Sequence, residues 1–276
     1  MTGTIKKPRG RPRTREGAAV TSPVATLDRA LNLLLVLAQS DGITLTDVSR
    51  RAGVSAPTAY RMLITLAGRG FVRNDETLGL WYVGVEAFRT GSAFTRDLKV
   101  VDIGRGVMHE LMHCTGETAN LAVEDDGDVV FVSQVECHEA IRAFFRPGTR
   151  GPIHASGVGK ALLAQLPAAR VGQLTQRKGL HGYTEKTITD LEALSEDLEQ
   201  IRRRGWSLDD EERHRGMRCI ASPIFNLHGE ALAGISVSGP TVRMQDRRLA
   251  EIGSMVKDAA AQITTSIGGV TPKRKR

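Results

Sequence analysis

The sequence predicts an α+β protein of two domains, in which a helical N-terminal domain precedes a larger domain built on a β-sheet. Three observations support this. The chain has 276 residues, enough for two separate cores. Residues 26–70 hold three segments with the apolar spacing of amphipathic helices. Beyond residue 117, strand-like apolar runs alternate with segments of helical periodicity.

Positive charge is concentrated at the two ends of the chain. Residues 1–16 hold six Lys/Arg against one acidic residue, and the final four residues are KRKR. The rest of the chain carries 28 basic against 30 acidic residues. Such ends cannot bury apolar surface, so we expect a disordered basic arm at 1–24 and a basic tail at 268–276, both suited to binding a polyanion.

The arm contains the stretch PRGRPR, which resembles an AT-hook. In that element Gly10 would let the backbone lie in the minor groove of A·T-rich DNA, where Arg9, Arg11 and Arg13 would enter the narrow floor. The alternative is a tail that adds charge without reading sequence. The glycine between two arginines favours the first interpretation, because a plain polycation has no use for it.

Residues 25–84 are predicted to form a winged helix-turn-helix. The second helix, TLTDVSRRAG, ends at Gly53, and the third starts at Ser55 with Pro57 in its first turn. FVRNDETLGLWYVG then has the pattern of a two-stranded wing. The first helix, TLDRALNLLLVLAQS, is expected to turn inward Leu27, Leu31, Leu34, Leu35 and Ala38.

The third helix has two different faces. Its inward stripe is predicted to comprise Ala59, Met62, Leu63 and Leu66, whereas Thr58, Arg61 and Thr65 recur on the opposite side. Small hydroxyls and an arginine suit the reading of a major groove. The alternative is a helical bundle with no nucleic-acid role. The residues predicted to contact DNA are Ser55, Thr58, Ala59, Arg61, Thr65 and, from the wing, Arg73.

The remainder is predicted to be a linker helix within 85–97 followed by a sheet domain at 98–267. The strands are expected at 117–123, 128–135, 219–225 and 231–238, and the helices at 156–166, 190–204 and 246–267. The longest apolar run is too short to span a bilayer, so no membrane partner is predicted and the expected location is cytoplasmic. Three cysteines without CxxC spacing indicate reduced thiols.

A motif of another class is HELMH at 109–113. In zinc peptidases, histidines at this spacing hold the metal and the glutamate acts as general base, so His109, Glu110 and His113 define an alternative function. A third ligand would have to come from Glu117, Glu124 or Asp125. Apolar neighbours on the same segment favour a partly solvated helix face instead, and no cofactor is predicted.

Several motifs in one order carry a family resemblance. AL-x-LL-x-x-LA, TLTDVSRRAGVSAPTAYRMLITLAGRGFV, CTGETANLAV, GPIHASGVGKALLA, GWSLDDEERHRGMRCIASPIF and AGISVSGP together resemble the IclR family of bacterial transcriptional regulators over residues 25–267. The resemblance implies a GAF-like effector domain with an antiparallel sheet and helices on its faces. It also implies double-stranded DNA with a roughly palindromic operator as a partner, and a homodimer or homotetramer.

The resemblance further implies an effector site. In glyoxylate- and pyruvate-responsive members, an Asp, a Cys and two Ser line the pocket, and the matching positions are Asp209, Cys219, Ser236 and Ser238. The two serines lie two apart on an expected strand, so both face one side. The small size of this set favours a 2-oxo acid such as glyoxylate over an aromatic acid. Gly157 and Val158 are expected to supply amides, and the wall to include Gly151, Met217 and Ile235.

Overall fold

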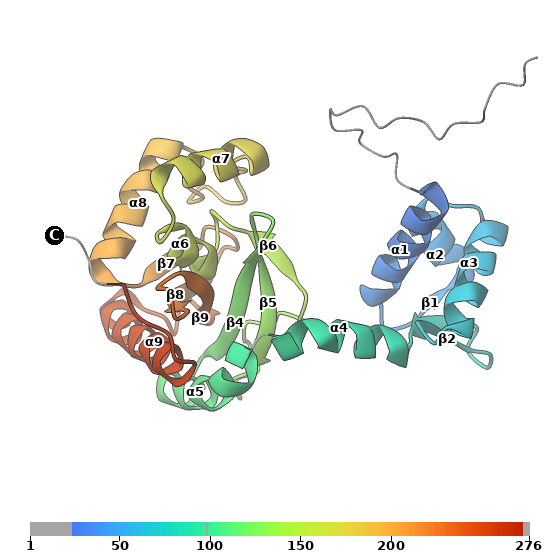
Figure 1. The fold of residues 1–276 in the computed structure, drawn as a ribbon, viewed down its shortest axis with the longest axis horizontal. Helices are drawn as coiled ribbons and strands as arrows, with labels where there is room; N and C mark the ends of the chain where they lie inside the picture. The colour runs from blue at the N-terminus through green and yellow to red at the C-terminus, as the bar shows by residue number, and fades with distance from the viewer. Residues whose placement is uncertain (1–23, 98, 273–276) are drawn as a thin grey trace, which may run out of the picture. The chain divides into compact units, whose positions relative to one another are not determined.

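The structure is a computed structural model, and it describes residues 24–97 and 99–272. The chain divides into two compact units between Ala93 and Phe94 (Figure 1). The elements of the first unit are α1 (Ala25–Ala38), β1 (Ile43–Thr44), α2 (Leu45–Ala52), α3 (Ala56–Gly68), β2 (Val72–Asp75), β3 (Leu80–Val83) and the start of α4 (Val85–Asp97).

The first unit is the predicted winged helix-turn-helix. The Thr44 hydroxyl caps α2 by accepting a hydrogen bond from the Asp47 amide at 3.2 Å. The helix ends at Gly53, whose φ of 66° is a left-handed conformation that glycine adopts without steric cost. The core of the first unit joins all three helices to the wing. Its buried members include Leu33, Leu37, Val48, Ala59, Leu63 and Trp81.

The inward face of α1 differs from the prediction. The buried residues are Leu33 and Leu37, while Leu27, Leu31 and Leu35 are each more than half exposed. Leu34 is half-buried and Ala38 is exposed. The helix carries two apolar stripes, and the stripe that packs against α2 and α3 is the one with Leu33 and Leu37. Of the expected inward set, Leu34 does pack against this core, whereas the prediction is wrong for the other four, and Leu27, Leu31 and Leu35 face outward within this unit.

The wing has three strands where the sequence predicted two. β2 and β3 pair in antiparallel register, with Arg73 opposite Tyr82. The short strand β1 joins the other edge of β3, placing Ile43 opposite Trp81. β1 is two residues long, too short to show an alternating pattern in the sequence.

The second unit is an α+β domain with one six-stranded antiparallel sheet in the order β6-β5-β4-β9-β8-β7. The strands predicted from the sequence correspond to β4, β5, β8 and β9. Its elements are α5 (Lys99–Thr115), β4 (Thr118–Asp125), β5 (Asp128–Val135), β6 (Arg150–Pro152), α6 (Gly157–Leu163), α7 (Ala168–Lys178), α8 (Leu191–Arg204), β7 (Ser207–Asp210), β8 (Met217–Phe225), β9 (Ala231–Pro240) and α9 (Asp246–Ser266).

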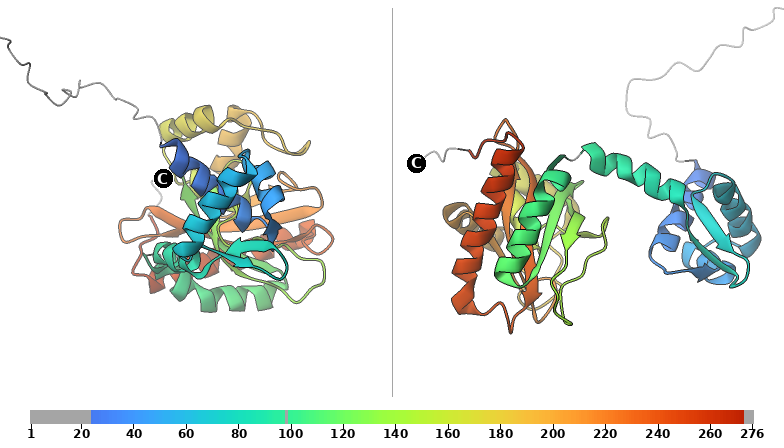
Figure 2. Two further views of the ribbon diagram at one scale, coloured as in Figure 1. Left: turned by 90° about the vertical axis from the view of Figure 1, so that its right-hand side faces the viewer. Right: turned by 90° about the horizontal axis from the view of Figure 1, so that it is seen from below.

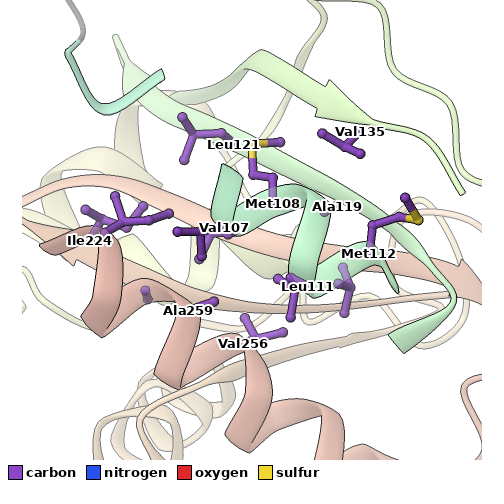
Figure 3. Packing of buried hydrophobic residues seen from close by; sticks show 14 of the residues in the cluster. Val107, Met108, Leu111, Met112, Ala119, Leu121, Val135, Ile224, Val256 and Ala259 are labelled. Atoms are coloured by element: carbon purple, nitrogen blue, oxygen red, sulfur yellow. The ribbon is translucent and has the colours of Figure 1, made fainter. Parts of the chain in front are cut away.

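Helices cover both faces of the sheet. α5 and α9 lie side by side on one face (Figure 2), where their apolar side chains pack against alternate residues of β4, β5, β8 and β9. Figure 3 shows Met108, Leu111 and Met112 of α5 in this core beside Leu121 and Val256. The opposite face is covered by α6, with α7 and α8 packed farther out, and forms a second core around Val158, Leu162, Leu194 and Leu198.

The connection between the units is α4, which extends three residues beyond the helix expected from Val85 to Phe94 and ends at Asp97. None of the described helices is long and apolar enough to cross a membrane.

Candidate functional sites

The outward face of α3 carries the side chains predicted to read DNA. Arg61 and Thr65 are exposed and Thr58 is half-buried. The Thr65 hydroxyl donates to the Arg61 carbonyl at 2.9 Å, a bond internal to the helix. The Arg61 guanidinium is thus the long cationic group at the middle of this face.

Ser55 and Thr58 form a pair at the start of α3. Ser55 has the extended backbone of a capping residue, but its hydroxyl lies 2.9 Å from the Thr58 hydroxyl rather than accepting from a backbone amide. On the wing, the Arg73 guanidinium stacks over the Tyr82 ring at 4.1 Å. Stacking restricts the arginine to one side of the wing while leaving its N–H donors available.

Ala59 is a correction to the predicted DNA contacts. Its exposure is 0 %, because it lies on the inward stripe of α3 against the core of the first unit. Its side chain therefore cannot touch DNA. The predicted arm contacts, Arg9, Gly10, Arg11 and Arg13, lie outside the described residues, as does the KRKR tail.

In the second unit, the strand register brings the predicted effector residues into rows on the α6 face of the sheet. Ser238 of β9 lies directly opposite Cys219 of β8, and Cys219 lies directly opposite Asp209 of β7. Because opposed residues on antiparallel strands point to the same face, these three side chains form one row. Ser236 belongs to the adjacent row on the same face, opposite Ala221.

The start of α6 lies directly over Cys219. A Cβ atom at Gly157 would be 2.8 Å from the Cys219 sulfur, so only glycine permits this approach. The Gly157 carbonyl accepts a hydrogen bond of 2.6 Å from the Ser207 hydroxyl, which ties α6 to β7. Val158 is fully buried, with its side chain in the second core.

Ser236 is an unsatisfied polar group. Its exposure is 0 %, and its hydroxyl oxygen has no hydrogen-bond partner within residues 24–97 and 99–272. Leaving a buried hydroxyl unpaired costs roughly 1 to 3 kcal/mol. Such a group in a native protein calls for an explanation, and a bound ligand or water that accepts the hydrogen bond is one.

Burial perturbs the titrating groups of this row. Desolvation, aided by the nearby charge of Glu212, raises the pKa of Asp209 to about 7. The Glu212 amide partly offsets this by donating to Asp209 Oδ1 at 2.7 Å. Desolvation and the charge of Asp209 raise the pKa of the Cys219 thiol to about 11, so the sulfur is a neutral thiol near pH 7.

A buried lysine lies beside the row. Lys160 of α6 is 1 % exposed and its Nζ lies 2.5 Å from Glu212 and 2.8 Å from Asp197 of α8. Burial works against its charge, but the two carboxylates outweigh it and raise the pKa of Lys160. Burial also raises the pKa of Glu212, whose second oxygen is unpartnered. Two carboxylates therefore pair with one buried cation, whose charge also acts on Asp209.

Two predicted wall residues do not belong to this group. Ile235 points to the opposite face, where it is fully buried in the core against α5 and α9. Strand alternation requires this, because Ser236 and Ser238 face α6 and Ile235 is offset from both by an odd number of residues. Gly151 lies on the edge strand β6, separated from β8 by three strands, and lines a cavity of about 230 Å³ with Ile153, His154, Lys178 and Tyr183. Met217 does share the face of Cys219, two residues along β8.

A larger cavity of about 850 Å³ lies between α8, α9 and the end of β8, lined by Arg202, Ser222 and Lys257. It contains none of the predicted effector residues. The candidate site is the group of polar side chains under α6, where Ser236 and the perturbed Asp209 share one face of the sheet.

Sequence reasoning missed two amides that adjoin the row. Asn120 of β4 lies directly opposite Ser236 and donates to the Ser238 hydroxyl at 3.3 Å. Gln134 of β5 lies opposite Asn120 and donates to its Oδ1 at 2.7 Å. The available signal was an asparagine at an inward position of the apolar run ETANLAV.

HELMH is an exposed patch of α5. His109, Glu110 and His113 are all exposed, while Leu111 and Met112 between them are buried. The described residues contain no group of three His, Cys, Asp or Glu side chains that could hold a metal ion. Of the possible third ligands, Glu117 is occupied in a bidentate pair with Arg243.

A winged helix-turn-helix followed by a separate antiparallel-sheet domain defines a two-domain transcriptional regulator. Residues 26–76 match the family model of the IclR helix-turn-helix domain. Residues 92–265 match that of the bacterial transcriptional regulator IclR C-terminal domain. The chain belongs to the IclR family of transcriptional regulators. It is therefore not an enzyme, and the zinc peptidase alternative is wrong.

Full-length relatives agree with this. The chain is 48 % identical to the HTH-type transcriptional regulator BhcR of Paracoccus denitrificans over 277 residues, covering 99 % of this chain and 98 % of the relative. It is 42 % identical to the transcriptional repressor IclR of Escherichia coli, covering 98 % and 100 %. The crystal structure of Thermotoga maritima IclR is similar with a TM-score of 0.76 at 27 % identity, covering 89 % and 100 %.

Proposed function

We propose that this regulator binds a roughly palindromic operator and that a small carboxylate effector, a 2-oxo acid such as glyoxylate, modulates that binding. The observation that carries the effector proposal is the fully buried, unpartnered hydroxyl of Ser236 beside Cys219 and Asp209. A carboxylate oxygen placed there would supply the missing acceptor.

The composition of the row favours a small acid. Ser236 and Ser238 present two hydroxyls on one face, which is enough to engage a single carboxylate. Asp209 is half protonated near pH 7 and can donate to a neighbouring oxygen, such as that of an oxo group. Cys219 contributes a compact, neutral wall. The approach of Gly157 leaves little room for an aromatic ring above the thiol.

On the DNA side, α3 is the proposed recognition helix. Thr58, Arg61 and Thr65 would face the base edges of the major groove, and Arg73 of the wing would contact the backbone. The N-terminal arm would add contacts in an adjacent minor groove or charge alone. Regulation of this kind takes place in the cytoplasm, where the DNA is.

The partner in this arrangement is a second copy of the chain. A palindromic operator requires two recognition helices related by a two-fold axis. The outward stripe of α1, Leu27, Leu31 and Leu35, is apolar, and its residues are 58, 53 and 63 % exposed. We propose that this stripe packs against the same stripe of another copy, in a homodimer or within a homotetramer.

The DNA-binding role can be tested with Arg61→Ala. Arg61 is exposed, so the change should leave the thermal midpoint of unfolding unaltered. It should weaken operator binding by about 1 to 3 kcal/mol, which is roughly 5- to 150-fold. The measurement is fluorescence anisotropy on the DNA that flanks the protein's own coding region.

The matched control is Arg170→Ala, which removes an exposed arginine of α7 in the other unit. This control should bind as tightly as the wild type. Equal DNA affinity of both variants and the wild type would contradict α3 as the recognition helix.

A further inference from the structure

The amide chain formed by Gln134, Asn120 and Ser238 has no part in the proposed function as described so far. It crosses three adjacent strands on the α6 face and ends at the effector row. Asn120 is completely buried and Ser238 is 3 % exposed. A buried polar chain of this kind has a direction, because every bond needs one donor and one acceptor.

The direction is set by the backbone. Gln134 Oε1 accepts from the backbone amide of Phe145 at 3.4 Å, and an amide N–H can only donate. The Gln134 nitrogen must then donate to Asn120 Oδ1 at 2.7 Å. This leaves the Asn120 nitrogen to donate to the Ser238 oxygen at 3.3 Å.

This direction determines where the Ser238 hydroxyl proton can point. Its oxygen already accepts from Asn120, so its own O–H can donate to the other side, where Cys219 lies directly opposite. Ser236, also on this face, makes no hydrogen bond of ordinary geometry, and the weak acceptor beside its hydroxyl is the Cys219 sulfur. Both hydroxyls are therefore donors on the face that α6 covers, and within the protein they reach only the weak acceptor of the neutral Cys219 thiol.

We propose that Asn120 and Gln134 are positioning residues that fix Ser238 as a hydrogen-bond donor, so that the site selects a carboxylate over the corresponding amide. This inference rests on the proposed effector site. A carboxylate offers acceptors alone, whereas an amide turns an N–H₂ donor toward at least one of the two hydroxyls. The mismatch leaves a buried donor unpaired, which disfavours the amide.

The test uses pyruvate and pyruvamide, which differ in the group concerned and match in size. Calorimetry on the full chain should show that the wild type binds pyruvate at least about tenfold more tightly than pyruvamide. Asn120→Leu keeps a neutral side chain of similar size but frees the Ser238 hydroxyl to rotate. The ratio of the two dissociation constants should then fall about five- to tenfold toward unity.

A double-mutant cycle with Ser238 distinguishes a positioning role of Asn120 from a merely structural one. In the Ser238→Ala background, Asn120→Leu should change the ratio no further, because the group through which Asn120 acts is gone. If Asn120→Leu weakens both compounds equally, or still changes the ratio without Ser238, the inference is wrong. Gln134→Met, at a half-buried position, should shift the ratio in the same direction and serves if Asn120→Leu does not fold.

The two proposals fail in different ways. If neither pyruvate nor glyoxylate binds the wild type, the effector proposal falls and takes this inference with it. If pyruvate binds the wild type and the ratio is indifferent to both amide variants, the inference alone falls.

Discussion

At the scale of single residues, the Ser236 hydroxyl is expected to lower the stability of the fold while it contributes to effector binding. Its buried hydroxyl has no partner in the described part of the chain, so folding leaves a polar group desolvated and uncompensated. Ser236→Ala should therefore raise the free energy of unfolding by roughly 1 kcal/mol. The same change should weaken glyoxylate or pyruvate binding about tenfold, since it removes a donor to the carboxylate. Chemical denaturation and calorimetry measure the two effects.

Ser222→Ala is a suitable control, because this buried serine of β8 donates to the Gly205 carbonyl at 3.0 Å. That variant should lose stability and keep its effector affinity. Destabilisation by Ser236→Ala of the same size as in the control would show that its hydroxyl has a partner, contrary to our account.

Asp209 makes stability depend on pH. Its pKa is raised from 3.8 to about 7, so the folded protein holds a proton that the unfolded chain releases. The resulting stability is fully present below about pH 4 and is lost as the pH rises through 7. Relative to Asp209→Asn, the wild type should lose roughly 2 to 4 kcal/mol between pH 4 and pH 8.

The groups around this carboxyl are Glu212, Lys160 of α6 and the Cys219 thiol of β8. Urea unfolding of both proteins across this range measures the difference. A constant difference from pH 4 to pH 8 would show that Asp209 titrates normally.

The site residues fall into two kinds with respect to prediction. Cys219, Asp209 and the serine pair could be assigned from motifs and from strand alternation. The same alternation places Ile235 on the other face, so that error was avoidable. Lys160 with Glu212 and Asn120 with Ser238 join positions 52 and 118 residues apart. Such contacts depend on register and helix placement, which no local pattern encodes.

At the scale of elements, periodicity predicted the helices of the first unit, then α6, α8 and α9, and the four central strands, but it did not predict α5. It could not choose between the two apolar stripes of α1, because burial depends on which stripe meets α2 and α3. β1, β6 and β7 are two to four residues long, below the length at which alternation is visible. α7 was missed because its buried face is Val171, Leu174 and a threonine, too few apolar groups to mark a helix.

The outward stripe of α1 has a testable role. In a Cys114→Ser background, which removes the exposed thiol, Leu31→Cys should be linked between two chains by a short bis-maleimide. We expect most chains to be linked, because Leu31 lies in the middle of the stripe and would be close to the two-fold axis. Gel electrophoresis under denaturing conditions reports the product.

Leu227→Cys places a thiol at another exposed leucine, in the turn between β8 and β9, and should give little product. Equal yields from the two positions, or no product from Leu31→Cys, would argue against α1 as the surface between copies.

At the scale of the whole molecule, two separately packed units are joined through α4, and each carries one of the proposed sites. An effector bound in the second unit can alter operator binding only if the DNA-competent arrangement holds it with a different affinity. The coupling is then reciprocal: the factor by which effector changes operator affinity equals the factor by which operator changes effector affinity.

The most direct test of this account is the operator dissociation constant, measured by anisotropy with and without saturating glyoxylate, for the wild type and for Ser236→Ala. Coupling of ordinary strength predicts a change of roughly 5- to 150-fold for the wild type. At the same glyoxylate concentration the shift should be much smaller for Ser236→Ala, whose affinity without effector should be normal. An operator affinity that stays constant while calorimetry shows glyoxylate bound would contradict the account.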